Sequence, residues 1–583
     1  MAIDFSLLVS PTIDTRFSEL RPAQEEVLRT YASGMHELSD IAIELPTGAG
    51  KTLIALLILE YWRKQGNRAA ILTGNKTLAK QLEGEANDLG VPTVRFEGRG
   101  EDFLPKALRA YRRAQAIAIM NYWVYINQKP AVESADFLVL DDAQLAEGAL
   151  SSLYSAQITR WEHNELFSEL MRLIAAYSDS PVADDFVKEI EVGPWRPIDL
   201  IPFLAMLDMW DEIETLLDMK LSDADSSDAA WTDLRFRWGR IRHRGRQTLM
   251  LVSPDEIVFR PYIYPAQDYK LLSAARQRIY MSATLHDPED LRRRLGTPSI
   301  RKIETSLELS REQDGRRLLI FNQTASPTSR VEPTDEVLVP LRELLLAEKK
   351  SVWLCSSKHE AARWRRWLEK ELGEVVTWEL TSTGDELEAF SMASEGHLFI
   401  GGRFEGMDFP DAACRLAVFP SLPVATGPLE RFVCEQLKDA SFQRTRMLER
   451  IKQGIGRCTR GENDYAVYYL LDTRFQAEME SKEFQALVSE RVRRQIEVGL
   501  ELTQDGMGQV VPFATRFLRG DFSEFDKREN EACPPTIPST EILEVSRSVT
   551  AEVNGWRALF ESRNLADACK LFEKVSAELP ESE

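Results

Sequence analysis

Cysteine is scarce in this sequence and is missing from more than half of it. The chain has 583 residues, no cysteine precedes Cys355, and no two cysteines stand at Cys-x-x-Cys spacing. A structural zinc site or a disulfide framework needs clustered or paired cysteines. The sequence therefore predicts neither. The six cysteines are Cys355, Cys414, Cys434, Cys458, Cys533 and Cys569.

Long apolar runs and a basic excess are also missing. No run approaches the roughly 20 apolar residues that cross a bilayer, and Met1–Phe5 shows no basic stretch ahead of an apolar one. We therefore expect no membrane segment, no secretory signal and a cytoplasmic location. The net charge of −21 argues against a surface coated with basic side chains. It leaves room for a local basic groove, because affinity for nucleic acid depends on local phosphate contacts.

The most informative stretch is Glu44–Thr52, which reads Glu-Leu-Pro-Thr-Gly-Ala-Gly-Lys-Thr. Apolar runs flank it on both sides, which indicates a strand, a tight loop and a helix. The backbone N–H groups of such a loop and the positive end of the helix form a cradle for phosphate. Lys51 would reach the outer phosphates, and the hydroxyl of Thr52 would hold Mg²⁺. The stretch predicts a Walker A nucleotide-binding loop rather than a structural glycine turn.

Other side chains fit a nucleotide site. The amide of Gln24 can bond both a donor and an acceptor on an adenine edge. Asp141 and Asp142 directly follow an all-apolar strand, 137–140. Asp141 would bind Mg²⁺, usually through water, and Asp142 would orient or deprotonate the water that attacks the γ-phosphate.

Strands and helices alternate in two separate parts of the chain. This alternation implies parallel sheets, with ligands at the carboxyl ends of the strands. In the second part, Arg457 and Arg460 share a helix face and could reach the γ-phosphate as arginine fingers. Ser282 and Thr284, at the end of a strand in the first part, could link the nucleotide site to a neighbouring domain. Strands are expected at 41–43, 69–73, 116–120, 137–140, 278–285, 351–355, 398–400, 415–419 and 466–471.

Residues 151–245 have helical periodicity and are expected to form an insertion. From Arg240 to Arg246 arginine recurs at every second residue. On a strand, Arg240, Arg242 and Arg244 would share a basic face suited to nucleic-acid phosphates, and a solvated charged strand is the alternative. Beyond a proline-containing linker, helices are expected at about 541–562 and 565–577, as a structural cap or as a docking site for a protein partner.

Taken in order, these blocks resemble the motifs of superfamily 2 helicases, in particular the XPD/DinG-like branch of iron–sulfur helicases. Glu44–Thr52 is similar to its Glu-x-Pro-Thr-Gly-x-Gly-Lys-Thr loop, and Gln453–Arg460 to its Gln-x-x-Gly-Arg-x-x-Arg motif. The resemblance covers about 15–500. Its other blocks are Gln24, Thr77–Leu82, Asn121-Tyr122, Asp141–Gln144, Met281–Leu285, Phe404–Asp408 and Leu471–Arg474.

The resemblance implies an α/β fold with two RecA-like domains of parallel sheet and a mainly helical, Arch-like insertion in the first. The expected limits are 1–150 with 246–305 for the first domain, 151–245 for the insertion, 306–500 for the second domain, and 501–583 for a linker and helical extension.

The resemblance also assigns roles, with ATP and Mg²⁺ as cofactors and a single nucleic-acid strand, DNA in preference to RNA, as partner. Nucleotide contacts are expected from Gln24, Pro46, Thr47, Gly48, Ala49, Gly50, Lys51, Thr52, Gly406, Asp408 and Gln453, and Mg²⁺ contacts from Thr52 and Asp141. Catalysis is expected from Lys51, Asp142, Arg457 and Arg460, and coupling from Ser282 and Thr284. Nucleic-acid contacts are expected from Thr77, Asn121 and Ser356 and, on the arginine pattern described above, from Arg240, Arg242 and Arg244.

The sequence departs from the family in two places. Gly98–Phe103 resembles the lead-in to the first ligand of the family's [4Fe–4S] cluster, yet no cysteine follows it. We therefore expect a cluster-free relative, as CRISPR-associated DinG-like proteins are. Asp142 and Gln144 stand where the family has glutamate and histidine. Aspartate is one methylene shorter, so slower ATP hydrolysis is expected.

These observations predict an ATP-dependent DNA helicase or single-strand translocase, with 5′→3′ movement implied by the resemblance. A second hypothesis is an ATPase subunit that is gated by nucleic acid and remodels or recruits partners, for example in a defence or CRISPR-associated complex, without unwinding duplex. A third is a degenerate nucleotide-binding scaffold, suggested by Asp142 and Gln144.

Overall fold

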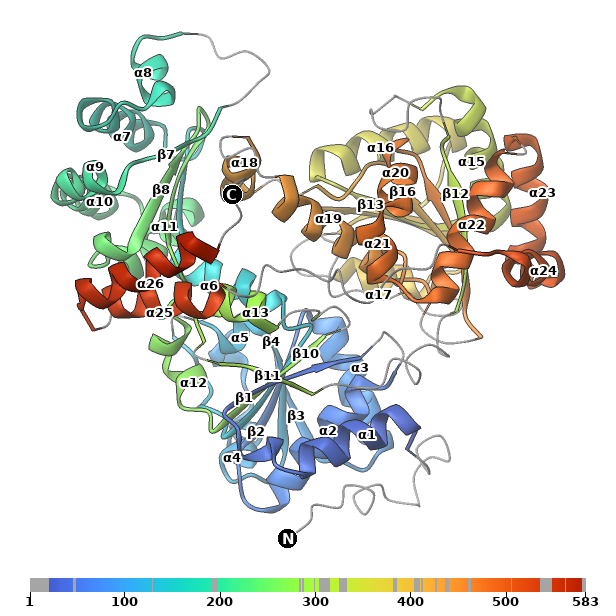
Figure 1. The fold of residues 1–583 in the computed structure, drawn as a ribbon, viewed down its shortest axis with the longest axis horizontal. Coiled ribbons are helices and arrows are strands. Elements are labelled where there is room, and N and C mark those ends of the chain that lie inside the picture. Colours follow the sequence, from blue (N-terminus) through green and yellow to red (C-terminus); the bar gives the residue numbers. More distant parts are fainter. Residues whose placement is uncertain are drawn as a thin grey trace.

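The computed structural model has three lobes, and a C-terminal helical pair lies between two of them (Figure 1). Two lobes contain a parallel sheet, and the third is an insertion in the first of these. The structure describes residues 20–578 except 46–48, 128, 191–196, 283–284, 286–287, 298, 304–314, 324–332, 381–384, 403–408, 410–412, 425–426, 436–439, 460–462, 505, 535–547 and 561.

The first domain is built on a seven-stranded parallel sheet with the order β11-β1-β10-β5-β2-β4-β3. Strands β1, β2, β4 and β5 consist mainly of apolar residues and are buried on both faces, the pattern expected of a parallel sheet covered by helices. The strands are β1 (Asp40–Glu44), β2 (Ala69–Thr73), β3 (Thr93–Phe96), β4 (Ile117–Asn121), β5 (Phe137–Asp141), β10 (Gln277–Ser282) and β11 (Arg301–Ile303). The helices are α1 (Pro22–Ala32), α2 (Lys51–Lys64), α3 (Lys76–Asp88), α4 (Pro105–Arg112), α5 (Tyr122–Tyr125), α6 (Leu145–Tyr154), α12 (Lys270–Ser273) and α13 (Pro288–Leu295).

The insertion combines helices with a four-stranded antiparallel sheet of order β6-β9-β8-β7. Two of its strands, β8 and β9, follow residue 245, where the sequence prediction ended the insertion. The strands are β6 (Ala156–Thr159), β7 (Asp199–Leu200), β8 (Thr248–Val252) and β9 (Glu256–Pro261). The helices are α7 (Asn164–Tyr177), α8 (Pro181–Val187), α9 (Phe203–Asp208), α10 (Trp210–Asp223) and α11 (Ala229–Ile241).

The strand predicted for the arginine-rich segment is wrong. Helix α11 continues to Ile241, and a short 3₁₀ turn, Gly245–Gln247, follows before β8. Leu234, Trp238 and Ile241 are buried and recur at helical spacing. Burial of this apolar face outweighs the alternation of the arginines, which alone suggested a strand.

The second domain is built on a six-stranded parallel sheet with the order β12-β17-β16-β13-β15-β14. Apolar side chains of α23 and α24 join its core, so this core continues beyond the predicted limit at residue 500. The strands are β12 (Arg316–Phe321), β13 (Lys350–Cys355), β14 (Thr377–Glu379), β15 (Gly396–Gly401), β16 (Leu416–Phe419) and β17 (Tyr465–Leu470). The helices are α15 (Asp335–Glu348), α16 (Lys358–Leu372), α17 (Asp385–Met392), α18 (Pro428–Glu435), α19 (Ala440–Gly454), α20 (Arg474–Glu480), α21 (Lys482–Leu487), α22 (Glu490–Gln504), α23 (Met507–Leu518) and α24 (Ser523–Glu531).

The last two helices, α25 (Val549–Phe560) and α26 (Leu565–Glu578), return to the first domain and the base of the insertion (Figure 1). Nε of Arg293 on α13 lies 2.7 Å from a carboxylate oxygen of Glu552. The ring of Trp556 stacks on Tyr262, which follows β9, with centroids 4.6 Å apart. The C-terminal extension therefore packs against a domain that precedes it in the chain.

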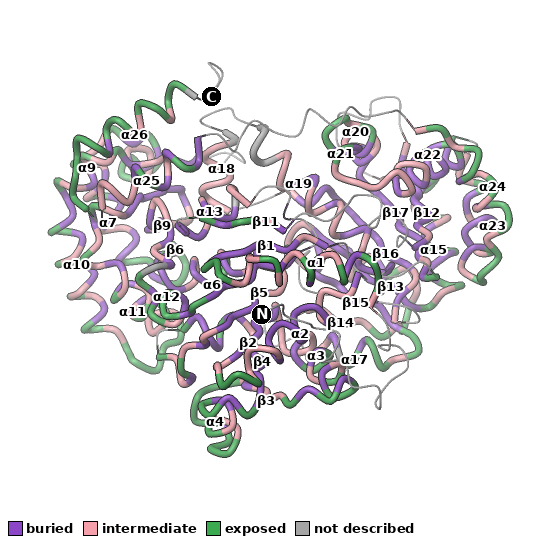
Figure 2. Tube along the Cα trace, turned by 60° about the horizontal axis from the view of Figure 1, so that its bottom comes forward, coloured by how far each residue is buried: buried purple, intermediate pink, exposed green. Residues whose placement is uncertain are grey.

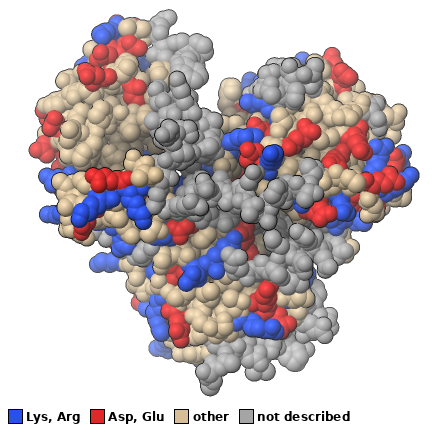
Figure 3. Space-filling view, viewed as in Figure 1, with Lys and Arg blue, Asp and Glu red and all other residues tan. Residues whose placement is uncertain are grey.

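Burial and charge follow this arrangement. The inner strands of both parallel sheets are buried, whereas α4 is largely exposed (Figure 2). Figure 3 shows Lys and Arg side chains interspersed with Asp and Glu on the face drawn there. Within the described residues, no helix combines the length and apolar composition that crossing a membrane requires.

A buried ion pair joins two neighbouring strands of the first sheet, β1 and β10. The guanidinium of Arg278 donates from Nε and Nη2 to the two carboxylate oxygens of Asp40, both at 2.6 Å. The hydroxyl of Tyr280 donates to Asp40 Oδ1 at 2.9 Å. Asp40 and Arg278 are 3% and 7% exposed, so the loss of either partner would leave an unpaired charge inside the protein.

We predict that Asp40→Ala lowers the free energy of unfolding by about 3–5 kcal/mol, the usual effect of breaking a buried pair. Glu25→Ala is the control, because it removes an exposed pair with Arg29 and should change stability by less than about 0.5 kcal/mol. Chemical denaturation followed by circular dichroism measures both. Equal effects of the two substitutions would contradict the role of the buried pair.

Candidate active site

Three predicted motifs meet at the carboxyl edge of the first sheet. The register places Glu44 opposite Ser282 and Asp141 opposite Met281, so β1, β10 and β5 end side by side. Beyond the strands, Leu45 N–H donates to Ser282 O at 3.1 Å, and Ala143 N–H donates to Met281 O at 3.0 Å. The end of β10 therefore fixes the exits of both neighbouring strands.

The described part of the Glu44–Thr52 loop has the geometry of a phosphate cradle. Gly50 adopts a φ of +83° and directly precedes α2. A Cβ at Gly50 would lie 2.1 Å from Nε2 of Gln24, so another residue there would strain the backbone and displace the Gln24 amide. The first N–H groups of a helix have no partner within it and attract anions. Residues of the loop therefore fit a nucleotide phosphate, while Pro46, Thr47 and Gly48 lie outside the described residues.

Lys51 and Thr52 begin helix α2 at this loop. The ammonium of Lys51 donates to the backbone carbonyl of Leu45 at 3.3 Å and so reaches back across the loop. Thr52 is the next helical residue and is half-buried. A lysine and a hydroxyl at these two places match a phosphate contact and a Mg²⁺ ligand.

Gln24 lies against the same loop. Its side chain is buried, and Nε2 donates to the carbonyl of Ala49 at 3.0 Å. Its Oε1 accepts from the backbone N–H of Arg21 at 3.0 Å at the start of α1. The structure thus brings Gln24 to the nucleotide loop, where its amide ties α1 to the loop, and contact with adenine stays a prediction.

The acidic pair occupies a tight turn after β5. Asp142 adopts a φ of +50°, a left-handed conformation that is unfavourable for a residue other than glycine. The buried hydroxyl of Tyr122 donates to the backbone carbonyl of Asp141 at 2.9 Å. Burial, reinforced by the nearby carboxylates of Asp141 and Asp142, raises the pKa of Tyr122 well above its ordinary value. Tyr122 therefore remains a neutral donor beside two acids, a role that its place after Asn121 did not reveal.

The other residues predicted at strand ends cap or begin helices. Asn121 Oδ1 accepts from the N–H of Val124 at 3.0 Å and caps α5. Thr77 lies in the first turn of α3, and Ser356 donates to a carboxylate oxygen of Glu360 at 2.8 Å. These positions are compatible with contact to a strand of nucleic acid, which stays a prediction.

The arginines of the expected basic face contact groups of the protein itself. Arg242 lies 2.5 Å from a carboxylate oxygen of Asp218, and Arg244 lies 2.8 Å from one of Asp268. Arg240 and Arg244 both stack over the ring of Tyr154, at 6.0 and 5.8 Å from its centroid. The stacking on Tyr154 anchors the end of α11 on α6, and the ion pairs engage acids of other elements, so binding of nucleic acid would have to compete with these contacts.

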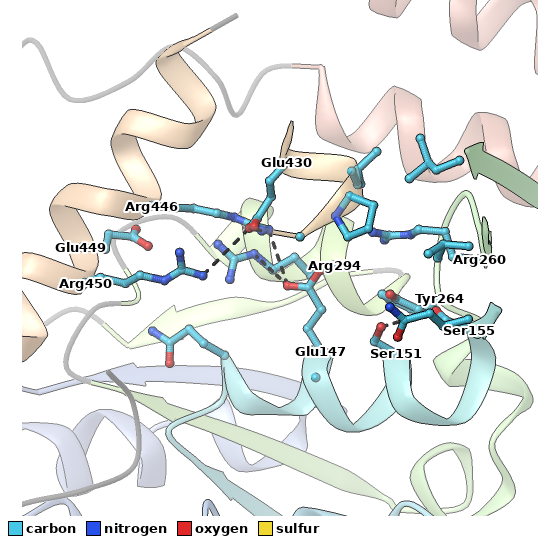
Figure 4. A pocket seen from close by; sticks show the side chains of 18 of the residues that line it. Glu147, Ser151, Ser155, Arg260, Tyr264, Arg294, Glu430, Arg446, Glu449 and Arg450 are labelled. Atoms are coloured by element: carbon cyan, nitrogen blue, oxygen red, sulfur yellow. Dashed lines mark hydrogen bonds and ion pairs between the residues drawn. The ribbon is translucent and has the colours of Figure 1, made fainter. Parts of the chain in front are cut away.

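The second domain presents its motif at the end of α19. Arg457 is buried, and its carbonyl accepts from Phe409 N–H at 2.8 Å. Gln453 lines a cavity of about 400 Å³ that Gln144 of the first domain also lines (Figure 4). The structure thus brings motif residues of both domains to one cavity. Thr284, Gly406, Asp408 and Arg460 lie outside the described residues.

No preassembled metal cluster accompanies these residues in the described parts of the chain. Within them, no group of three or more His, Cys, Asp and Glu side chains is arranged to hold a metal ion. Mg²⁺ usually keeps several waters and is held by one or two protein groups together with substrate phosphates. Thr52 and Asp141 suit that kind of site.

We predict that Gly50→Ala weakens ATP binding about tenfold or more, because displacement of a binding group by about 1 Å has effects of this size. Gly66→Ala is the matched control, since Gly66 has a φ of +82° and a Cβ at this position would meet nothing within 4 Å. It carries the same backbone strain but no clash with Gln24. Equilibrium titration with a fluorescent ATP analogue distinguishes the two, and equal affinities would exclude the tight contact as a determinant of binding.

Comparison with known proteins supports the same assignment for both domains. Residues 17–139 match the family described as "Type III restriction enzyme, res subunit", and residues 341–491 match the "Helicase C-terminal domain". A viral protein named as helicase 22, from Sulfolobus islandicus filamentous virus (isolate Iceland/Hveragerdi), is 25% identical over 231 residues. That alignment spans 36% of this chain and 38% of the viral protein.

Two solved structures share the fold. An XPD helicase structure is 15% identical, with a TM-score of 0.51, and the alignment covers 81% of this chain and 99% of that one. An apo XPD structure is also 15% identical with a TM-score of 0.51, and 80% and 98% of the two chains are covered. The two domain matches and the motif order support a superfamily 2 helicase that resembles the XPD/DinG branch, and the two solved structures show the shared fold.

Proposed function

We propose that this helicase is an ATP- and Mg²⁺-dependent motor that moves 5′→3′ along single-stranded DNA and works without an iron–sulfur cluster. The observation that carries the proposal is the convergence of β1, β10 and β5 at one sheet edge, with Gln144 and Gln453 of opposite domains lining one cavity nearby. Absence of cysteine before residue 355 supports the cluster-free form, because cluster ligation requires thiolates. DNA and the direction of movement rest on the family resemblance.

In this proposal, the first domain holds the nucleotide and the second completes the site. Lys51 contacts the outer phosphates, and Thr52 and Asp141 hold Mg²⁺, which would neutralise charge on the phosphates. Asp142 orients or deprotonates the attacking water. Arg457 and Arg460 approach the γ-phosphate from the second domain, so that closure around ATP and reopening after hydrolysis shift the domains along the strand.

A second candidate is an ATPase that is gated by nucleic acid and acts on partner proteins without unwinding. The missing cluster ligands favour it, because the family uses the cluster domain to separate strands. The segment 541–583 is the proposed partner site. Within it, α25 packs on α13 and Tyr262, whereas much of α26 is exposed, so α26 is the part that a partner would contact.

Asp142→Asn should reduce ATP hydrolysis by about 10²–10⁴-fold, the usual contribution of a general base. The affinity for ATP should change little, because the phosphates are held by the loop and α2. Asp225→Asn, at an exposed loop acid, serves as the control and should leave hydrolysis unchanged. Turnover retained by Asp142→Asn would remove this residue from the role of base.

Strand displacement tests the motor directly. Duplexes with a 5′ or a 3′ single-stranded tail, in DNA and in RNA, are incubated with protein, ATP and Mg²⁺. We expect displacement from the 5′-tailed DNA. Displacement only from the 3′-tailed substrate would reverse the proposed direction, and hydrolysis stimulated by a single strand without displacement would favour the gated ATPase. Absence of hydrolysis would leave a nucleotide-binding scaffold.

A further inference from the structure

A relay of ion pairs connects the two RecA-like domains beside the shared cavity (Figure 4). Arg446 on α19 lies with Nη2 3.5 Å from Oε2 of Glu147 on α6. Its Nη1 lies 2.6 Å from Oε1 of Glu430 on α18, within its own domain. Arg294 on α13 approaches the same oxygen of Glu147 at 3.7 Å. One arginine of the second domain thus bridges a carboxylate of each domain.

Both ends of this relay lie close in sequence to predicted catalytic residues. Glu147 is in the first turn of α6, which begins at Leu145 directly after the turn that contains Asp142. Arg446 is on α19, which ends at Gly454 shortly before Arg457. A helix is stiff over such a distance, so a shift of Arg446 relative to Glu147 would shift Arg457 relative to the acidic pair.

The ion pairs are shielded from water enough to affect how the two domains are held together. The side chains of Glu147, Arg446 and Glu430 are 21%, 16% and 13% exposed. Charges at this depth interact more strongly than a surface pair does, because solvent screens them less. The same helix offers a contrast in Arg444, whose Nε lies 2.9 Å from Glu478 of its own domain.

We propose that Arg446, held by Glu147, is a positioning residue that sets the placement of Arg457 over the nucleotide. The inference rests on the proposed function, because it assigns Arg457 to the γ-phosphate. Arg446 does not touch the nucleotide in this scheme. It acts by holding the end of α19 against the helix that follows the acidic pair, so that the two halves of the site close in register.

The proposal predicts an effect on turnover rather than on ATP binding. Arg446→Ala and Glu147→Gln should each lower kcat for strand-stimulated hydrolysis about tenfold, which corresponds to about 1.4 kcal/mol of activation free energy. The dissociation constant for a fluorescent ATP analogue should change less than about twofold, because the contacts of the first domain with the bound nucleotide are unchanged. Arg446→Lys should restore part of the loss, because it keeps the charge without the fork of the guanidinium.

A double-mutant cycle separates the relay from a general loss of stability. If Arg446 acts through Glu147, the variant with both substitutions should be no slower than either single variant. Arg444→Ala is the matched control, since it removes an ion pair of the same helix that stays within the second domain, and kcat should be unchanged.

The possible results distinguish the role of Arg446 from the proposed function itself. Three results would contradict the role of Arg446: additive effects in the cycle, an equal loss of kcat with Arg444→Ala, or weaker ATP binding at constant kcat. None of them affects the proposed function as long as the wild-type protein hydrolyses ATP. A wild-type protein without hydrolysis would overturn the proposed function and the relay with it.

Discussion

The hydrogen bonds at the carboxyl end of β10 are the constraint on which the site depends. Leu45 and Ala143 leave β1 and β5 and donate to neighbouring carbonyls of Ser282 and Met281. Because these bonds fix the points at which the chain leaves β1 and β5, they also fix the distance between the nucleotide loop and the acidic pair. The strands supply this precision because they are buried on both faces, and loops alone could not hold the loop and the acidic pair in register.

Much of this arrangement could be predicted from local sequence. The apolar runs before Leu45 and Asp141 predicted strands, and the structure confirms β1 and β5 there. The alternation of strands and helices predicted two parallel sheets, which the structure and its likeness to XPD confirm. The strands and their alternation with helices depend on residues that are close in sequence, so they can be predicted from the amino-acid sequence alone. The roles of the individual site residues stay predictions, and several of those residues, including Arg460, lie outside the described ones.

The sequence-based predictions fail where contacts between residues distant in sequence determine the local structure. The arginines from Arg240 to Arg246 alternate, yet burial of Trp238 and Ile241 extends helix α11 to Ile241, and a turn and a short 3₁₀ helix follow in place of a strand. Arg242 and Arg244 pair with Asp218 and Asp268, acids that are distant in sequence. No local pattern predicts the pairing of Glu147 with Arg446, or the return of α25 to α13. The position of Glu147 shortly after the acidic pair indicates an ion pair between the domains only once the helix that faces it is known.

The central claim is that one ATP molecule is shared by both domains. A structure of the full chain with a non-hydrolysable ATP analogue and Mg²⁺ tests it most directly. The account predicts the phosphates at the start of α2 beside Lys51, with the guanidinium of Arg457 within hydrogen-bond reach, about 3 Å, of the γ-phosphate. A nucleotide held by the first domain alone with Arg457 remote from it, or phosphates bound elsewhere, would contradict it.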